Sequence, residues 1–126
     1  MQTARSHGLT LSLMLISAGL LSFAFAGHAA AGPSFRCSGK LNPTERAICA
    51  SAALSALDRE IANGFQLAVD NITSEAVGGT QADVRKFRSE QAAFLRRRNS
   101  CGASVGCIAA AYRQRLVTLD EMNQPE

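Results

Sequence analysis

The sequence predicts an all-α fold, a small four-helix domain of two helical hairpins stapled by two disulfides. Three observations support this fold class. From residue 43 onward, apolar side chains recur at three- and four-residue steps, which is the spacing of one face of an α-helix. No stretch shows the strict alternation of apolar and polar residues that is typical of a half-buried strand. Four cysteines, an even number, are available to stabilise a domain of about 95 residues.

The segment 1–31 has the order of a cleavable signal peptide. A start that carries Arg5 as its one fixed charge is followed by an apolar run and then by small residues. A membrane anchor is the alternative, but the run of about 17 residues is at the short edge of what spans a bilayer and lacks a strongly charged far flank. Two A-x-A sites compete, so cleavage is expected after Ala26 or Ala31, and a single domain at 32–126 remains. This domain is predicted to be periplasmic or secreted, with no membrane contact after cleavage.

The first hairpin begins with a short helix from about Pro43 to Ala50. Asn42 is a cap residue, proline is favoured at the first helical position, and Glu45 completes a capping-box pattern. Ser51 can then cap a second, longer helix with one apolar face. The residues of that face are Leu54, Leu57, Ile61, Phe65 and Ala68 or Val69.

The second hairpin follows a turn-rich segment at 73–80. Thr80, followed three residues later by Asp83, is expected to start the third helix, which ends in the basic run 96–98. Its inner stripe is predicted to hold Val84, Phe87, Gln91, Phe94 and Leu95. Ser104 or a neighbour can cap the last helix. The apolar face of that helix is predicted to hold Ile108, Tyr112, Leu116 and Leu119.

Four cysteines allow three disulfide connectivities, and the sequence alone does not choose among them. We favour the local pairs Cys37 with Cys49 and Cys101 with Cys107, because each closes a loop next to a helix end. Each bond is expected to contribute about 2 to 4 kcal/mol in an oxidising compartment. The cysteine spacing does not match zinc knuckles, so no metal or other cofactor is expected.

Charge and residue types argue against several function classes. The chain has 13 basic and 10 acidic side chains, so loss of Arg5 leaves a net charge near +2. That charge is too weak to indicate nucleic-acid binding by bulk electrostatics. A serine or cysteine nucleophile commonly needs a histidine base, and His28 next to the cleavage sites is the only candidate. The carboxylates of Glu45, Asp58 and Glu60 do not form a convincing catalytic pair, since Asp58 and Glu60 point to different sides of one helix. We therefore expect a binding protein, not an enzyme.

Five motifs together form a specific pattern. They are Phe35-x-Cys37, Glu45-Arg46-Ala47-Ile48-Cys49, Leu54-x-x-Leu57-Asp58, Gln91-x-x-Phe94-Leu95-x-x-Arg98-Asn99-x-Cys101 and Cys107-x4-Tyr112-x2-Arg115-x3-Leu119. This pattern resembles the LprI-type family, the lysozyme-inhibitor LprI N-terminal domain, over essentially the whole mature chain. The resemblance implies a small secreted or lipid-anchored bacterial envelope protein. Because one member is reported to inhibit lysozyme, it also implies inhibition of lysozyme-type muramidases as a candidate function.

The chain departs from the family pattern at three positions. Phe94 stands where the family usually has Trp, Phe65 where it often has Tyr, and Arg36 where an acidic residue is common. The first two changes remove polar tips but keep apolar bulk, so the core is expected to be preserved. Tyr112 and Phe35 are expected to be core residues.

Two sets of polar residues are candidates for a defined role. Asp58, Gln91 and Arg98 are predicted to form a buried or half-buried hydrogen-bond network that locks the two hairpins together. Lys40, Arg96 and Arg97 are tentative binding residues, which would enter the acidic cleft of a muramidase and pair with its catalytic carboxylates. Since three arginines at a helix end also complement the helix dipole, a solvated helix end is the alternative for that run.

A protein partner is expected, with a lysozyme as the leading candidate. The alternative is an envelope-maintenance or protein-interaction module that inhibits nothing. An exposed apolar patch on the folded domain would favour that alternative. A protruding cationic loop would favour the inhibitor.

Overall fold

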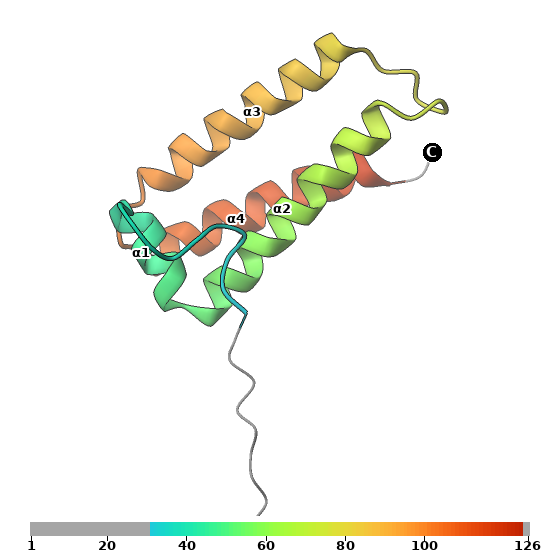
Figure 1. The fold of residues 1–126 in the computed structure, drawn as a ribbon. Helices are drawn as coiled ribbons and strands as arrows, with labels where there is room; N and C mark the ends of the chain where they lie inside the picture. Colours follow the sequence, from blue (N-terminus) through green and yellow to red (C-terminus); the bar gives the residue numbers. More distant parts are fainter. Residues whose placement is uncertain (1–30, 125–126) are drawn as a thin grey trace, which may run out of the picture.

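The computed structural model describes residues 31–124, and within this range it contains four helices and no strand (Figure 1). The helices are α1 (Pro43–Ala50), α2 (Ala52–Ile72), α3 (Gln81–Asn99) and α4 (Val105–Asn123). The predicted all-α fold class is therefore confirmed. Except for Ala31, the predicted signal peptide lies outside the described residues. In the described part of the chain, no helix combines the length and apolar character needed to cross a membrane.

All four helices begin at the caps that the sequence predicts. Reciprocal capping boxes start α1 and α3, where each cap side chain accepts from a backbone N–H and a carboxylate accepts from the cap residue's own N–H. These boxes pair Asn42 with Glu45, and Thr80 with Asp83. Single serine caps, Ser51 and Ser104, start α2 and α4. The local sequence therefore determines where each helix starts.

The three long helices lie along one another, with α3 antiparallel to both α2 and α4 (Figure 1). α2 packs most extensively against α4, so the two predicted hairpins are joined through these helices. Gly64 lies at this contact, where a Cβ atom would stand 3.3 Å from Leu119 Cδ1. The Asn123 amide also donates to the Gly64 carbonyl at 3.1 Å. A glycine on α2 thus allows the C-terminal half of α4 to approach closely.

α1 lies across the end of the molecule where α2 and α4 begin and α3 ends (Figure 1). Its Thr44 hydroxyl is fully buried and bonds the carbonyls of Asn99 and Gly102, in the turn between α3 and α4. The Ser55 hydroxyl, at the start of α2, bonds the Ile48 carbonyl at 2.9 Å. The two Thr44 bonds fix the first hairpin against the turn of the second, and the Ser55 bond fixes α1 to α2.

One continuous apolar core connects the four helices. Its buried members are Ile48, Leu54, Ile61, Ala68, Phe87, Phe94, Ile108, Ala109, Tyr112 and Leu119. The rings of Phe65 and Phe87 stack with centroids 4.9 Å apart, which joins α2 to α3. The expectation that Leu95 lies on the inner stripe of α3 is wrong, since this residue is 36% exposed. Phe94 and Arg98 point inward instead, and Leu95 is rotated about 100° away from Phe94 on the helix.

Both disulfides form between the local pairs that we favoured from the sequence. Cys37–Cys49 ties the segment before α1 to the end of that helix. Cys101–Cys107 closes the turn between α3 and α4. No cysteine among the described residues is free. Both bonds lie at the same end of the molecule as α1.

Candidate functional site

A buried ionic cluster joins α2, α3 and α4. Arg98 Nη1 lies 3.4 Å from Asp58 Oδ1 and 3.1 Å from the Tyr112 hydroxyl oxygen. The Tyr112 hydroxyl in turn donates to Asp58 Oδ1 at 2.7 Å. All three side chains are buried, and within residues 31–124 this is the only ion pair. Because an unpaired charge in the core is strongly destabilising, the cluster holds the three helices in one arrangement.

The second carboxylate oxygen of Asp58 holds the segment that precedes α1. Ser34 donates to Asp58 Oδ2 through its backbone N–H at 2.7 Å and through its hydroxyl at 2.6 Å. Arg59, the next residue on α2, donates to the carbonyls of Ala31 and Gly32. Both carboxylate oxygens of Asp58 are therefore engaged, and the N-terminal segment is fixed to α2.

The environment of Tyr112 makes its hydroxyl a permanent donor. Burial raises the pKa of this hydroxyl well above its ordinary value, and the hydrogen bond to Asp58 raises it further, while the Arg98 charge opposes the shift. The group consequently stays protonated beyond the pH near 10 at which a free tyrosine ionises. Its hydrogen bonds join α2, α3 and α4.

Gln91, which the sequence placed in a network with Asp58 and Arg98, has a different partner. Its Oε1 accepts from Arg115 Nε at 3.0 Å, so Gln91 links α3 to α4 beside the ionic cluster. Arg115 is 7% exposed, and its guanidinium carbon lies 5.4 Å from the Phe87 ring centroid and 5.8 Å from that of Phe94. The ionic cluster thus joins the two hairpins, whereas the Gln91–Arg115 bond joins the two helices of the second hairpin.

Sequence reasoning missed three of the polar residues that join separate elements of the fold. Tyr112 was expected only as a core residue, Arg115 was named only as part of a motif, and Ser34 was given no role. A signal for Arg115 was available: it follows Tyr112 by three residues, so both lie on the same face of α4. Nothing in the sequence indicated Ser34, because its partner is 24 residues away.

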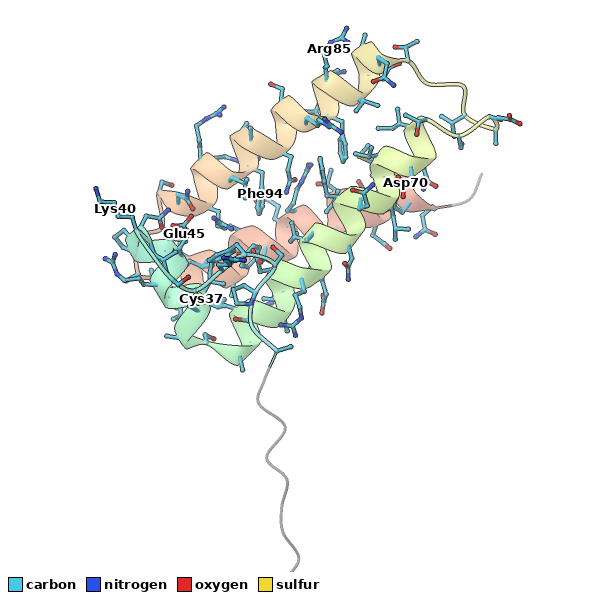
Figure 2. All side chains as sticks on the ribbon, in the orientation of Figure 1. Cys37, Lys40, Glu45, Asp70, Arg85 and Phe94 are labelled. Atoms are coloured by element: carbon cyan, nitrogen blue, oxygen red, sulfur yellow. A yellow bond between two sulfur atoms is a disulfide. The ribbon has the colours of Figure 1, made fainter. Side chains whose placement is uncertain are left out.

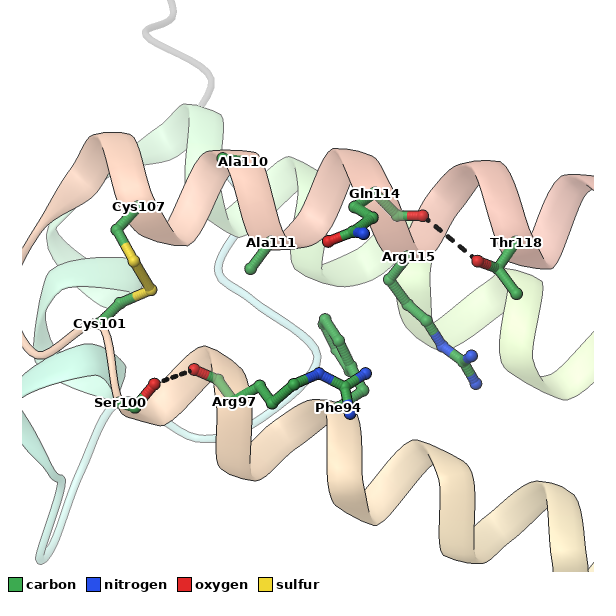
Figure 3. A pocket seen from close by; sticks show the side chains of 10 residues that line it. All are labelled: Phe94, Arg97, Ser100, Cys101, Cys107, Ala110, Ala111, Gln114, Arg115 and Thr118. Carbon is green, nitrogen blue, oxygen red and sulfur yellow. Dashed lines mark hydrogen bonds between the residues drawn. A yellow bond between two sulfur atoms is a disulfide. The ribbon is translucent and has the colours of Figure 1, made fainter.

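A groove of about 530 Å³ runs between the second half of α3 and the first half of α4 (Figure 3). The Cys101–Cys107 disulfide lies at one end, and Phe94 and Ala111 supply apolar walls. The polar side chains that line it include Arg97, Gln114 and Arg115, and none of the described lining residues is acidic. The groove therefore carries positive charge on an otherwise apolar and neutral surface.

Only one of the three candidate binding residues lines the α3/α4 groove. Lys40 is exposed in the loop between Cys37 and the start of α1, and its side chain extends away from the body of the molecule (Figure 2). Arg96 and Arg97 are exposed in the last turn of α3, and of these two only Arg97 lines the α3/α4 groove. Within residues 31–124, none of the three forms an ion pair.

A second surface feature lies between α2 and α4. A shallow groove of about 570 Å³ is flanked by Leu67 and Val117, which are 56% and 59% exposed. Gly64, Leu116 and Leu119 also line it. This groove is mainly apolar and lies on a different side of α4 from the cationic one.

The described part of the chain offers no group of three side chains arranged to hold a metal ion. When the chain is compared with protein-family models, curated proteins and solved structures, nothing matches. We therefore infer the roles of Lys40, the two grooves and the ionic cluster from the geometry of this molecule alone.

Proposed function

We propose that this chain is a non-catalytic binding protein of the LprI type that acts in the periplasm or outside the cell and inhibits lysozyme-type muramidases. The observation that carries the proposal is Lys40, an exposed cation without an ionic partner in residues 31–124, on a loop that a disulfide ties to α1. The signal-like sequence at 1–31 and the two disulfides support a location in an oxidising compartment.

The Lys40 loop is constrained on both sides. Cys37 fixes its start, and the capping box of Asn42 and Glu45 fixes its end. Gly39, in the turn before Lys40, has a φ of 85°. Glycine adopts this left-handed conformation without steric cost. A loop held in one conformation loses little entropy when it binds. It could therefore place the Lys40 ammonium between the two catalytic carboxylates of a muramidase.

Residue composition supports a non-catalytic role. The segment 32–126 contains no histidine to act as a general base. Asp58, the most buried carboxylate within residues 31–124, is engaged by Ser34, Arg98 and Tyr112. A net charge near +2 gives little long-range attraction, so inhibition would depend on contacts formed after the proteins meet.

The proposal is tested by titrating the mature protein, with both disulfides verified, into muramidase assays with lysozymes of several types. We expect inhibition that Lys40→Ala weakens about tenfold, as when one charge of a desolvated pair is removed. Arg85→Ala is the matched control, because it removes one exposed charge at the opposite end of the molecule (Figure 2). No inhibition at micromolar excess of the protein would contradict the proposal.

The apolar groove between α2 and α4 favours a second candidate, an envelope module that binds another protein and inhibits nothing. Leu67 and Val117 present exposed apolar surface that a partner could cover. This candidate requires that the double variant Leu67→Ser, Val117→Ser lose a partner that both the wild type and Lys40→Ala still bind. A partner that the double variant still binds and that Lys40→Ala loses would favour the Lys40 loop as the contact.

A further inference from the structure

Two arginine side chains line the α3/α4 groove. Arg97 reaches in from α3 and Arg115 from α4, and none of the described residues that line the groove is a carboxylate (Figure 3). Glu90 lies close enough to favour the charge on Arg115, but it forms no ion pair within residues 31–124. The positive charge of the groove is therefore only partly balanced by the protein itself.

Arg115 is held firmly but left incompletely bonded. Its Nε–H donates to Gln91, and the rings of Phe87 and Phe94 lie beside the guanidinium group. Its Nη2 atom is buried and has no hydrogen-bond partner among the described residues. Buried donors in native proteins are nearly always paired, and a charged donor without a partner is costly. Because the Arg115 side chain lines the groove, a rotation of its guanidinium group would present this unpaired donor to a partner from outside the chain.

Electrostatics agree with this geometry. Burial lowers the pKa of the Arg115 guanidinium, Glu90 raises it and the like charge of Arg97 lowers it again. Arg115 nevertheless remains charged at neutral pH, because a guanidinium group does not lose its proton in proteins. A negatively charged ligand between Arg97 and Arg115 would relieve the repulsion between the two guanidinium groups. It would also replace the hydration that Arg115 loses on burial.

We propose that the α3/α4 groove binds a small organic oxyanion, a ligand with a carboxylate or phosphate group that Arg115 and Arg97 hold together. Planar guanidinium groups pair with either oxyanion through two parallel hydrogen bonds. The side chain of Gln114 adds a neutral amide donor, while Phe94, Ala111 and the disulfide would contact the uncharged part of the ligand. The volume of about 530 Å³ lies within the range of small-molecule sites. This site is independent of Lys40 and of muramidase inhibition.

The test uses the disulfide-intact mature protein labelled with ¹⁵N, titrated with sodium malonate or with inorganic phosphate. Sodium chloride at equal ionic strength controls for screening. Because Arg115 Nε–H is buried and bonded to Gln91, its resonance should be visible and should shift on binding. A shift with malonate alone identifies a carboxylate ligand, with phosphate alone a phosphate ligand, and with both the shared oxyanion chemistry. Shifts no larger than those with chloride overturn the proposal.

Variants decide whether binding occurs in this groove. Arg97 is exposed, so the variant Arg97→Gln should fold normally. We expect this variant to bind the oxyanion five- to tenfold more weakly than the wild type. Arg115→Lys keeps the charge but loses the planar fork, so it should also weaken binding. Arg85→Gln removes the same charge from the exposed face of α3 and should change affinity less than twofold. Equal effects of Arg97→Gln and Arg85→Gln on oxyanion affinity would refute the site. Unchanged oxyanion affinity in Lys40→Ala would show that the site is independent of the Lys40 loop.

Discussion

Three consecutive arginines show how sharply the environment changes from one residue to the next. Arg98 is buried against Asp58, Arg97 lines the α3/α4 groove, and Arg96 is exposed. Successive residues on a helix are rotated by about 100°, so three consecutive arginine side chains point to the core, the groove and the solvent. The sequence could place all three at a helix end. Their separate roles follow from how α2 and α4 pack against α3.

The same limit explains the polar contacts between the helices. The sequence singled out Asp58, Gln91 and Arg98, and the structure brings Asp58 and Arg98 together. It pairs Gln91 with Arg115 instead. These partners lie 24 residues apart on different helices, so their meeting depends on the rotation and depth of α4 relative to α3. No local sequence pattern specifies those two quantities.

The titration of Tyr112 provides a test at this scale, since it is the only tyrosine and the chain has no tryptophan. The folded pKa of Tyr112 is raised by burial, then by Asp58, whereas an unfolded tyrosine ionises near pH 10. Absorbance at 295 nm should therefore show ionisation near pH 10 in urea and clearly above pH 10 in the folded protein. A folded-state midpoint near 10 would mean that the hydroxyl is open to solvent.

The same shift predicts the alkaline stability of the fold. Because the folded pKa of Tyr112 is raised, its contribution is fully present below about pH 10 and is lost as pH rises toward the folded value. Over that window one extra proton stays bound to the folded state, which increases the unfolding constant by up to about tenfold per pH unit. Tyr112→Phe is the control, because it should lack this component of the pH dependence.

At the scale of elements, the helix boundaries are predicted well because they depend on nearby residues. Cap side chains bond backbone groups two or three positions away, so Ser51 and Thr80 could be identified from sequence. The inner stripe of α3 was predicted less well. Only one narrow row of this helix is buried, ending in Arg98, and Leu95 lies beside that row instead of on it. A strongly charged helix gives a weak apolar pattern from which to read its orientation.

The turn between α2 and α3 is constrained by one glycine. A Cβ atom at Gly79 would lie 2.3 Å from the Ile72 carbonyl oxygen, so the backbone next to the Thr80 cap would have to move. We expect Gly79→Ala to destabilise the protein by about 1 to 3 kcal/mol, as overpacking does. Gly106→Ala is the matched control on α4, where a Cβ meets nothing within 4 Å. Urea unfolding should show it neutral or stabilised by up to about 1 kcal/mol.

At the scale of the whole molecule, the covalent and ionic ties lie together. Both disulfides, α1 and the buried ends of α2, α3 and α4 lie at one end (Figure 1). The opposite end is held by weaker contacts, such as the stacked rings of Phe65 and Phe87 and the Asn71–Asn123 hydrogen bond. The even cysteine count predicted the two disulfides. Their location at one end of the molecule could be seen only from the arrangement of the helices.

Loss of each disulfide should cost stability according to the loop that it closes. The separations are 12 residues for Cys37–Cys49 and 6 for Cys101–Cys107. The loop-closure relation then gives about 3 kcal/mol for the first bond and about 2 kcal/mol for the second. Urea unfolding of the Cys→Ser pairs would measure both losses. A larger loss for the shorter loop would show that native packing around Cys101 and Cys107 outweighs chain entropy.

The contact of Ser34 with Asp58 has a consequence for the order in which the fold can be completed. Its acceptor exists only where α2 has formed, and the same carboxylate also binds Tyr112 from α4, which follows it by 54 residues. During synthesis, Ser34 therefore emerges long before its site is complete. Release of Ser34 from Asp58 would free the segment before Cys37 while leaving both disulfides intact.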